Sequence, residues 1–153
     1  MNDACDISQR PEKPEGNPSP EEIRGILENC RTVAVVGLSN KPNRDSYRVA
    51  LYLADHGYKV IPVNPALEEK GWEGIKAYNT IAQVPGEVDI IDLFRRADSI
   101  GELAADILAK KPRVVWLQLG IVNNPVAAIL RKAGITVVQD KCIKIEHNAL
   151  IGG

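Results

Sequence analysis

Five short apolar runs, rich in β-branched residues, constrain the fold of this chain more than any other feature. They occupy residues 32–36 (TVAVV), 59–63 (KVIPV), 88–93 (VDIIDL), 114–117 (VVWL) and 136–138 (TVV). Each run is continuous rather than alternating, which is typical of strands that are covered on both faces. The sequence therefore predicts a sheet that lies between two layers of helices.

Helical patterns separate these runs. Ser19, Pro20 and Glu22 form a capping box, which predicts a helix that ends near Cys30. After the first run, apolar residues recur at helical spacing, and Gly57 is the expected C-terminal cap. The apolar face expected for this second helix consists of Tyr47, Ala50, Leu51 and Ala54.

The second half of the chain repeats this alternation. A second capping box at residues 99–102 predicts a helix that continues through Leu108, and Asn124 opens a further helix that Gly134 closes. One helical turn is expected within residues 78–83. Strands alternating with helices require crossovers, so the predicted fold is α/β, a Rossmann-like, doubly wound parallel sheet of about five strands in three layers.

The ends of the chain and its composition bound the remaining possibilities. Four prolines in residues 9–20 predict a flexible arm over residues 1–18, followed by a single domain over residues 19–153. With 19 basic and 20 acidic residues, the chain has no net field that favours nucleic acid or an anionic membrane. Its three cysteines are widely spaced, which argues against a metal site and favours a reducing cytoplasm.

The loop after the first strand, VVGLSNKPNRDSY, has the position of a phosphate-binding turn, because ligands of such sheets bind beyond the carboxyl ends of the strands. Gly37 permits a tight turn, and the next helix offers free N–H groups. Hydroxyl and basic side chains that favour phosphate follow at Ser39, Lys41, Arg44 and Ser46. The alternative is an ordinary connection with solvated basic residues.

The residues around this loop argue against a dinucleotide site of the usual kind. The loop lacks the GxGxxG pattern, and the second strand ends in Val63, Asn64 and Pro65 rather than in an acidic residue. An NADP site that uses Lys41 or Arg44 for the additional phosphate stays open.

Four collinear segments resemble the small stand-alone CoA-binding proteins, which are similar to the N-terminal domain of the succinyl-CoA synthetase alpha subunit. They are VVGLSNKPNRDSYRVALYLADHGYKVIPVNP, VDIIDLFRRAD, VVWLQLGIVNNPVAAILRKAGITVV and QDKCIKIEH. The resemblance implies that coenzyme A or an acyl-CoA is the ligand and that Asn40 joins the phosphate loop. The adenosine half would then border Val63, Asn64 and Pro65, with Lys70 near a phosphate.

The resemblance also implies that the rest of the ligand passes the third and fourth strand ends. Phe94 and Arg95 follow the third strand, and Gln118 and Gly120 follow the fourth, with Gln118 placed to bond an amide of the pantetheine arm. A core role for Phe94 and a tight turn at Gly120 are the alternatives. Cys142 is either a small buried hydrophobe or a thiol close to that of CoA.

No recognisable catalytic residues follow from the sequence. His56 precedes Gly57 at the expected end of a helix, and Cys142 with His147 is too few ligands for a metal. We therefore expect a CoA-binding protein rather than an enzyme. The alternatives are an NADP-dependent or acyl-CoA-using enzyme that needs a partner subunit, and an acyl-CoA-sensing regulator. A homodimer supported by an exposed Trp72 also stays open, as does an unidentified partner protein.

Overall fold

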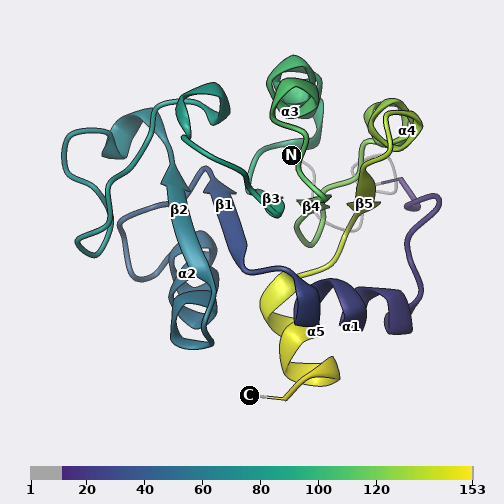
Figure 1. Ribbon diagram of the computed structural model, residues 1–153, viewed down its shortest axis with the longest axis horizontal. Helices are drawn as coiled ribbons and strands as arrows, with labels where there is room; N and C mark the ends of the chain where they lie inside the picture. The colour runs from purple at the N-terminus through teal and green to yellow at the C-terminus, as the bar shows by residue number, and fades with distance from the viewer. Residues whose placement is uncertain (1–11, 153) are drawn as a thin grey trace, which may run out of the picture.

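A parallel sheet runs through the middle of the protein in the computed structural model, which describes residues 12–152 (Figure 1). Its five strands stand in the order β2-β1-β3-β4-β5, and every neighbouring pair is parallel. They are β1 (Thr32–Val36), β2 (Lys59–Val63), β3 (Ile90–Leu93), β4 (Val114–Leu117) and β5 (Thr136–Val138). The predicted α/β, Rossmann-like class is confirmed, with β3 shorter than expected.

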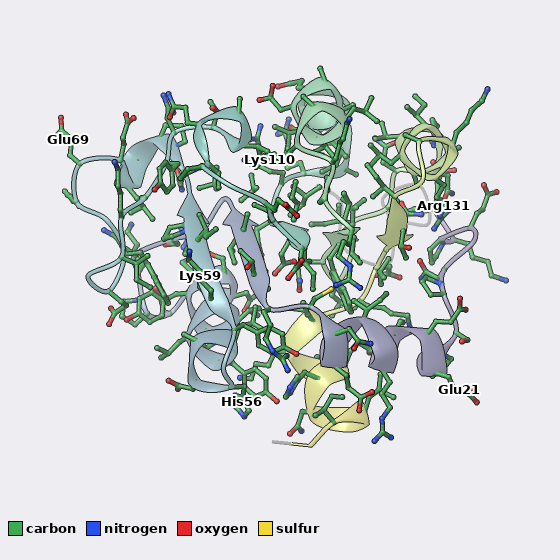
Figure 2. All side chains as sticks on the ribbon, viewed as in Figure 1. Glu21, His56, Lys59, Glu69, Lys110 and Arg131 are labelled. Carbon is green, nitrogen blue, oxygen red and sulfur yellow. The ribbon has the colours of Figure 1, made fainter. Side chains whose placement is uncertain are left out.

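Helices cover both faces of this sheet (Figure 1). One layer contains α1 (Pro20–Asn29), α2 (Asp45–Asp55) and α5 (Ile143–Leu150), and the other contains α3 (Ala104–Lys110) and α4 (Asn124–Lys132). Successive residues of a strand point to opposite faces, so Val33 and Val35 of β1 join one core while Ala34 and Val36 join the other. Side chains fill the space on both sides of the strands (Figure 2).

The predicted first helix has the expected capping box. The backbone N–H of Glu22 donates to Ser19 Oγ at 3.2 Å, and the backbone N–H of Ser19 donates to Glu22 Oε1 at 2.9 Å. Helix α4 begins at Asn124 as predicted, and the preceding residue caps it, since the Asn123 side chain accepts from the N–H of Val126. Local sequence therefore determines both helix starts.

The apolar face predicted for α2 is correct in part, because Ala50 is buried and Tyr47 and Ala54 pack against the core, but Leu51 does not belong to it. The buried residues are Ser46, Val49, Ala50 and Leu53, while Leu51 is 39% exposed. Ser46 points inward because its hydroxyl accepts a hydrogen bond from the N–H of Ser39, 3.0 Å away. The buried face of α2 therefore differs from the predicted one. Tyr47 is half-buried at the edge of this face, where its ring packs against Trp72.

Two further helix predictions need correction. The capping box predicted at residues 99–102 does not form, because Ala97–Leu103 is a 3₁₀ helix and α3 starts only at Ala104 without a side-chain cap. Helix α5 was not expected at all. This helix has only 8 residues, too few to be stable by itself in water, and it packs against α1 and α2. Tertiary contacts rather than local propensity therefore account for it.

Part of the predicted flexible arm is hydrogen bonded to the edge of the sheet. Asn17 Nδ2 donates to the Gln139 carbonyl at 2.9 Å, and the Gln139 N–H donates to Asn17 Oδ1 at 2.8 Å. Arg131, labelled in Figure 2, donates through Nη1 to the carbonyl of Glu15 at 2.7 Å. These residues therefore protect the open edge next to β5, while residues 1–11 lie outside the described part of the chain.

Trp72 is buried rather than exposed. Its side chain is 2% exposed, and its ring meets that of Tyr47 edge to face at a centroid distance of 5.4 Å. Because Trp72 is not exposed, it does not support a homodimer.

Within residues 12–152, none of the helices combines the length and apolar character that a membrane span requires.

Candidate functional site

The candidate site lies where strand order reverses, between the carboxyl ends of β1 and β3. The two strand ends approach each other closely, since the N–H of Phe94 donates to the Val36 carbonyl at 2.9 Å. Gly37 has a φ of +87°, and a Cβ atom at this position would stand 2.5 Å from the Phe94 carbonyl oxygen. Only glycine fits here, because any side chain would collide with the neighbouring backbone.

The loop that follows Gly37 is held by its own hydroxyl groups. Ser46 Oγ accepts from the N–H of Ser39 at 3.0 Å, and Ser39 Oγ accepts from the N–H of Lys41 at 3.1 Å. Both hydroxyls therefore position the loop, and each keeps its own O–H hydrogen for a ligand. Arg44 immediately precedes the first turn of α2, next to the positive end of the helix dipole.

Three neighbouring pockets line this edge of the sheet. The β2 pocket, of about 390 Å³, includes Gly37, Val63, Asn64, Pro65 and Arg95. The loop pocket, of about 420 Å³, includes Gly37, Ser39, Arg44, Ser46 and Phe94. The Cys142 pocket, of about 320 Å³, includes Phe94, Gln118 and Cys142. Because Gly37 lines the first two pockets and Phe94 the last two, the three pockets lie next to one another in a row.

The β2 pocket is organised by Asn64. Its Nδ2 group donates to the Leu38 carbonyl at 2.9 Å, and its Oδ1 atom accepts from the N–H of Ala66 at 3.0 Å. The Asn64 side chain therefore links the end of β2 to the loop after β1 and is not free to point at a ligand. Asn79, Thr80, Ile81 and Asp106 also line this pocket. Sequence reasoning missed the first three because the pattern between β2 and β3 is weak, and it missed Asp106 because that residue lies in α3, away from any strand end.

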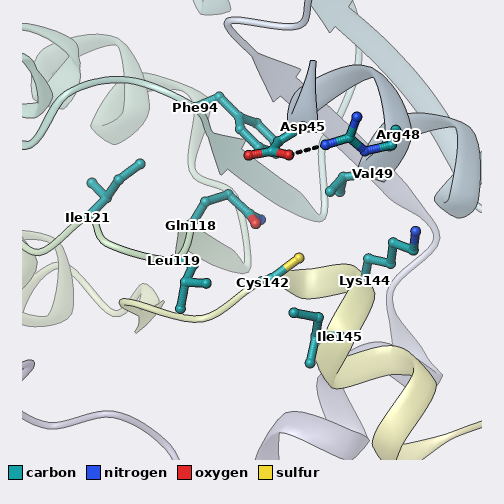
Figure 3. A pocket seen from close by; sticks show the side chains of 10 residues that line it. All are labelled: Asp45, Arg48, Val49, Phe94, Gln118, Leu119, Ile121, Cys142, Lys144 and Ile145. Atoms are coloured by element: carbon teal, nitrogen blue, oxygen red, sulfur yellow. Dashed lines mark hydrogen bonds and ion pairs between the residues drawn. The ribbon is translucent and has the colours of Figure 1, made fainter. Parts of the chain in front are cut away.

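The Cys142 pocket is mostly apolar with a charged rim (Figure 3). Val49, Ile121 and Ile145 supply apolar surface, while Arg48 donates a hydrogen bond to Asp45 at the rim. Cys142 is half-buried at the first residue before α5, and its thiol points toward the pocket (Figure 3). The structure thus brings Cys142 beside Phe94 and Gln118, as the hypothesis of a ligand-facing thiol requires.

A buried carboxylate lies beneath this pocket. Gln118 Nε2 donates a hydrogen bond to Oδ1 of Asp92, whose side chain is fully buried. The other oxygen, Oδ2, has no hydrogen-bond partner among the described residues. Burial raises the pKa of Asp92 to about 7, and the Gln118 hydrogen bond opposes this shift. Sequence reasoning missed Asp92, although a carboxylate inside an apolar run was a usable signal.

Several predicted site residues lie apart from the three pockets. Asn40, Lys41, Lys70 and Gly120 are absent from the pocket walls. Lys41 and Lys70 are exposed, and the N–H of Gly120 donates to Asp140 Oδ1 at 2.7 Å in a turn. Lys41 is nonetheless in the loop that lines the loop pocket, whereas Lys70 is in the separate segment that leads to the buried Trp72.

The histidines lie in the layer of α1, α2 and α5, away from the row of pockets. His147 is buried, with its Nδ1 atom 2.8 Å from the hydroxyl of Tyr52, and His56 caps the end of α2. Burial lowers the pKa of His147, so its neutral form is favoured. Within the described range, no group of three or more His, Cys, Asp or Glu side chains is arranged to hold a metal ion.

Comparisons with known proteins identify relatives that match most of the chain. YneT of Bacillus subtilis is 40% identical over 131 residues, which are 86% of this chain and 96% of YneT. A solved structure of a hypothetical protein from Pyrococcus horikoshii has a TM-score of 0.85 and 34% identity, covering 92% of this chain and 98% of that protein.

A partial match reaches a much longer protein. The alpha subunit of acetate–CoA ligase (ADP-forming) II from Pyrococcus furiosus is 44% identical over 63 residues, which are 40% of this chain and 13% of the subunit. A family model described as a CoA binding domain matches residues 31–148, a span that contains the whole sheet and all three pockets. The chain therefore belongs to the CoA-binding domain family.

Proposed function

We propose that the protein binds coenzyme A or an acyl-CoA along the row of three pockets. The adjacency of these pockets, which share Gly37 and Phe94 as lining residues, is the observation that carries the proposal. CoA is a long ligand with an adenosine end, a charged middle and an apolar arm. The row offers a matching series, because a polar loop pocket with Arg44 and Asp45 on its wall lies between the β2 pocket and the largely apolar Cys142 pocket.

The arrangement supports one orientation of the ligand. The phosphates would lie in the loop pocket. There they would meet Arg44, the free O–H groups of the loop serines and the N-terminal turn of α2, all of which favour phosphate. The β2 pocket would take the adenosine half, where Arg95 offers charge to the 3′-phosphate and Asp106 offers an acceptor to the adenine amino group. The pantetheine arm then extends past Phe94 toward Gln118 and Cys142.

Replacing Arg44 tests the phosphate assignment. We expect Arg44→Ala to weaken CoA binding about tenfold at low ionic strength and less at high salt, because screening already reduces its attraction for phosphate. Lys41→Ala should have a smaller effect, since Lys41 is absent from the pocket wall. Isothermal titration calorimetry at two salt concentrations measures both. Lys59→Ala, at the amino end of β2, is the matched control (Figure 2), and an equal loss in that control would contradict the assignment.

Native mass spectrometry of freshly purified protein is the direct test of the ligand. An added mass equal to CoA or an acyl-CoA, together with a thermal shift on adding CoA, would support the proposal. A thermal shift with NADP and none with CoA would favour the dinucleotide alternative instead. A protein that binds CoA and also turns over an acyl-CoA only when a second subunit is added would favour the enzyme alternative, to which the similarity with a ligase subunit points.

The position of Cys142 predicts a mixed disulfide. With CoA disulfide as the oxidant, the Cys142 thiolate attacks one sulfur, forms Cys142–S–S–CoA and releases the second CoA as a thiolate. In a Cys5→Ser background, which removes the cysteine outside the described residues, we expect a reducible CoA adduct, and none once Cys142→Ser is added. Cys30 is the internal control, since its side chain is 1% exposed and burial raises its pKa. An adduct that persists in Cys142→Ser but disappears in Cys30→Ser would remove Cys142 from the site.

A further inference from the structure

Asp92 occupies a position in the core where an apolar residue would ordinarily be expected. It is paired in register with Val35 of β1 and Trp116 of β4, and these two neighbours belong to the core beneath α1, α2 and α5. Its side chain has no exposed area, and one of its oxygens has no partner within residues 12–152. A buried carboxylate with an unpaired oxygen destabilises a fold, so its presence calls for a compensating role.

The one hydrogen bond that Asp92 makes determines the orientation of Gln118. Gln118 follows Trp116 by two residues, so both side chains project on the same side of the sheet as Asp92. The NH₂ group of Gln118 donates to Asp92 Oδ1, which leaves the amide carbonyl oxygen as the free polar atom. In Figure 3 this amide points into the space between Phe94, Val49 and Cys142.

Resting on the proposed CoA function, we propose that Asp92 is a positioning residue that holds the Gln118 carbonyl oxygen toward the Cys142 pocket as a hydrogen-bond acceptor. The ligand group recognised in the Cys142 pocket is then a hydrogen-bond donor. CoA can supply such a donor there, namely an amide N–H of its pantetheine arm. Without Asp92 the amide could turn over and present its NH₂ group, which would repel the same ligand N–H.

Two ligands separate this role from general support of the fold. CoA contains the pantetheine arm, whereas adenosine 3′,5′-bisphosphate lacks it and reaches only the β2 and loop pockets. We expect Asp92→Leu, an apolar replacement of similar size, to weaken CoA binding about tenfold and to leave the affinity for the bisphosphate unchanged. Asp92→Asn keeps a carbonyl acceptor for Gln118, so its CoA affinity should stay within about threefold of the wild type.

A double-mutant cycle tests whether Asp92 acts through Gln118. If it does, Gln118→Leu weakens CoA binding by a similar factor, and the Asp92→Leu/Gln118→Leu double variant binds no more weakly than Gln118→Leu alone. Asp89→Ala is the matched control. That carboxylate, at the other end of β3, accepts from the N–H groups of Arg31 and Thr32 at 2.7 and 3.1 Å, so its removal should lower stability without changing either affinity.

Each contrary outcome has a distinct meaning. Equal weakening of both ligands in Asp92→Leu, or additive effects in the cycle, would overturn the positioning role. Equal losses in Asp92→Leu and Asp92→Asn would overturn it as well, because only the leucine variant lacks an acceptor. A wild-type protein that binds the bisphosphate but not CoA, or neither ligand, would instead refute the proposed function itself.

Discussion

Gly37→Ala should unfold at a melting temperature roughly 6 to 12 °C below that of the wild type and should lose most of its CoA affinity. An alanine at a positive φ costs about 1 to 2 kcal/mol, and its Cβ would stand 2.5 Å from the Phe94 carbonyl oxygen. The ends of β1 and β3 must then separate, at a total cost on the order of 3 kcal/mol. Calorimetry with and without CoA measures both effects.

Gly57→Ala is the matched control for this experiment. Gly57 has a φ of +89°, close to that of Gly37, but a Cβ atom there would meet nothing within 4 Å. It should therefore show only the backbone part of the penalty and should bind CoA normally, because Gly57 follows α2 and lies outside the three pockets. Indistinguishable stabilities and affinities for the two variants would contradict the close approach of the strand ends that builds the candidate site.

The stability of the wild type should fall as the pH rises from about 3.8 to about 7 and then level off, owing to Asp92. Burial raises the pKa of its carboxyl group from 3.8 to about 7, so the folded protein retains a proton that the unfolded chain releases. For a raised pKa the stabilisation is complete below the unfolded value, falls between the two values and is fully lost once the pH has passed the folded value. This carboxyl group alone should remove about 2 to 3 kcal/mol of unfolding free energy between about pH 5 and about pH 9.

Asp92→Asn isolates that contribution from other titrating groups. Asparagine has almost the same shape and does not ionise, so the variant should lack the Asp92 part of the pH dependence. Urea unfolding of both proteins across this pH range gives the difference directly, and the stability of the variant relative to the wild type should grow with pH. Parallel curves for the two proteins would show that Asp92 is already ionised in the folded state at low pH.

If CoA binds as proposed, these two residues link stability to binding at this edge of the sheet. Gly37 allows two strand ends to approach closely, and the same approach brings the loop pocket and the Cys142 pocket into one row. If the pH dependence expected above is found, Asp92 lowers the stability of the fold near neutral pH, which is the property expected of a residue that serves a site rather than the core.

The sequence by itself determined the strands and their class. Short β-branched runs bounded by turns and separated by helical patterns admit few arrangements, and β1, β2, β4 and β5 have the bounds that those runs predict. The first loop was recognisable for the same reason, since a glycine directly after the first strand must lie at the carboxyl edge of a parallel sheet. Local signals also determined the starts of α1 and α4, where capping side chains lie within three residues of the groups they bond.

Only the tertiary structure decided which residues meet. Asp92 lies in β3, Gln118 follows β4 and Cys142 follows β5, so their proximity depends on strand order and register rather than on any local pattern. The same holds for α5, which packs on α1 and α2, and for Asn64, which bonds the loop after β1. In each case the two segments that meet are far apart in the sequence. The sequence of either segment alone would allow several different neighbours, so only the packing of the whole fold decides which one it contacts.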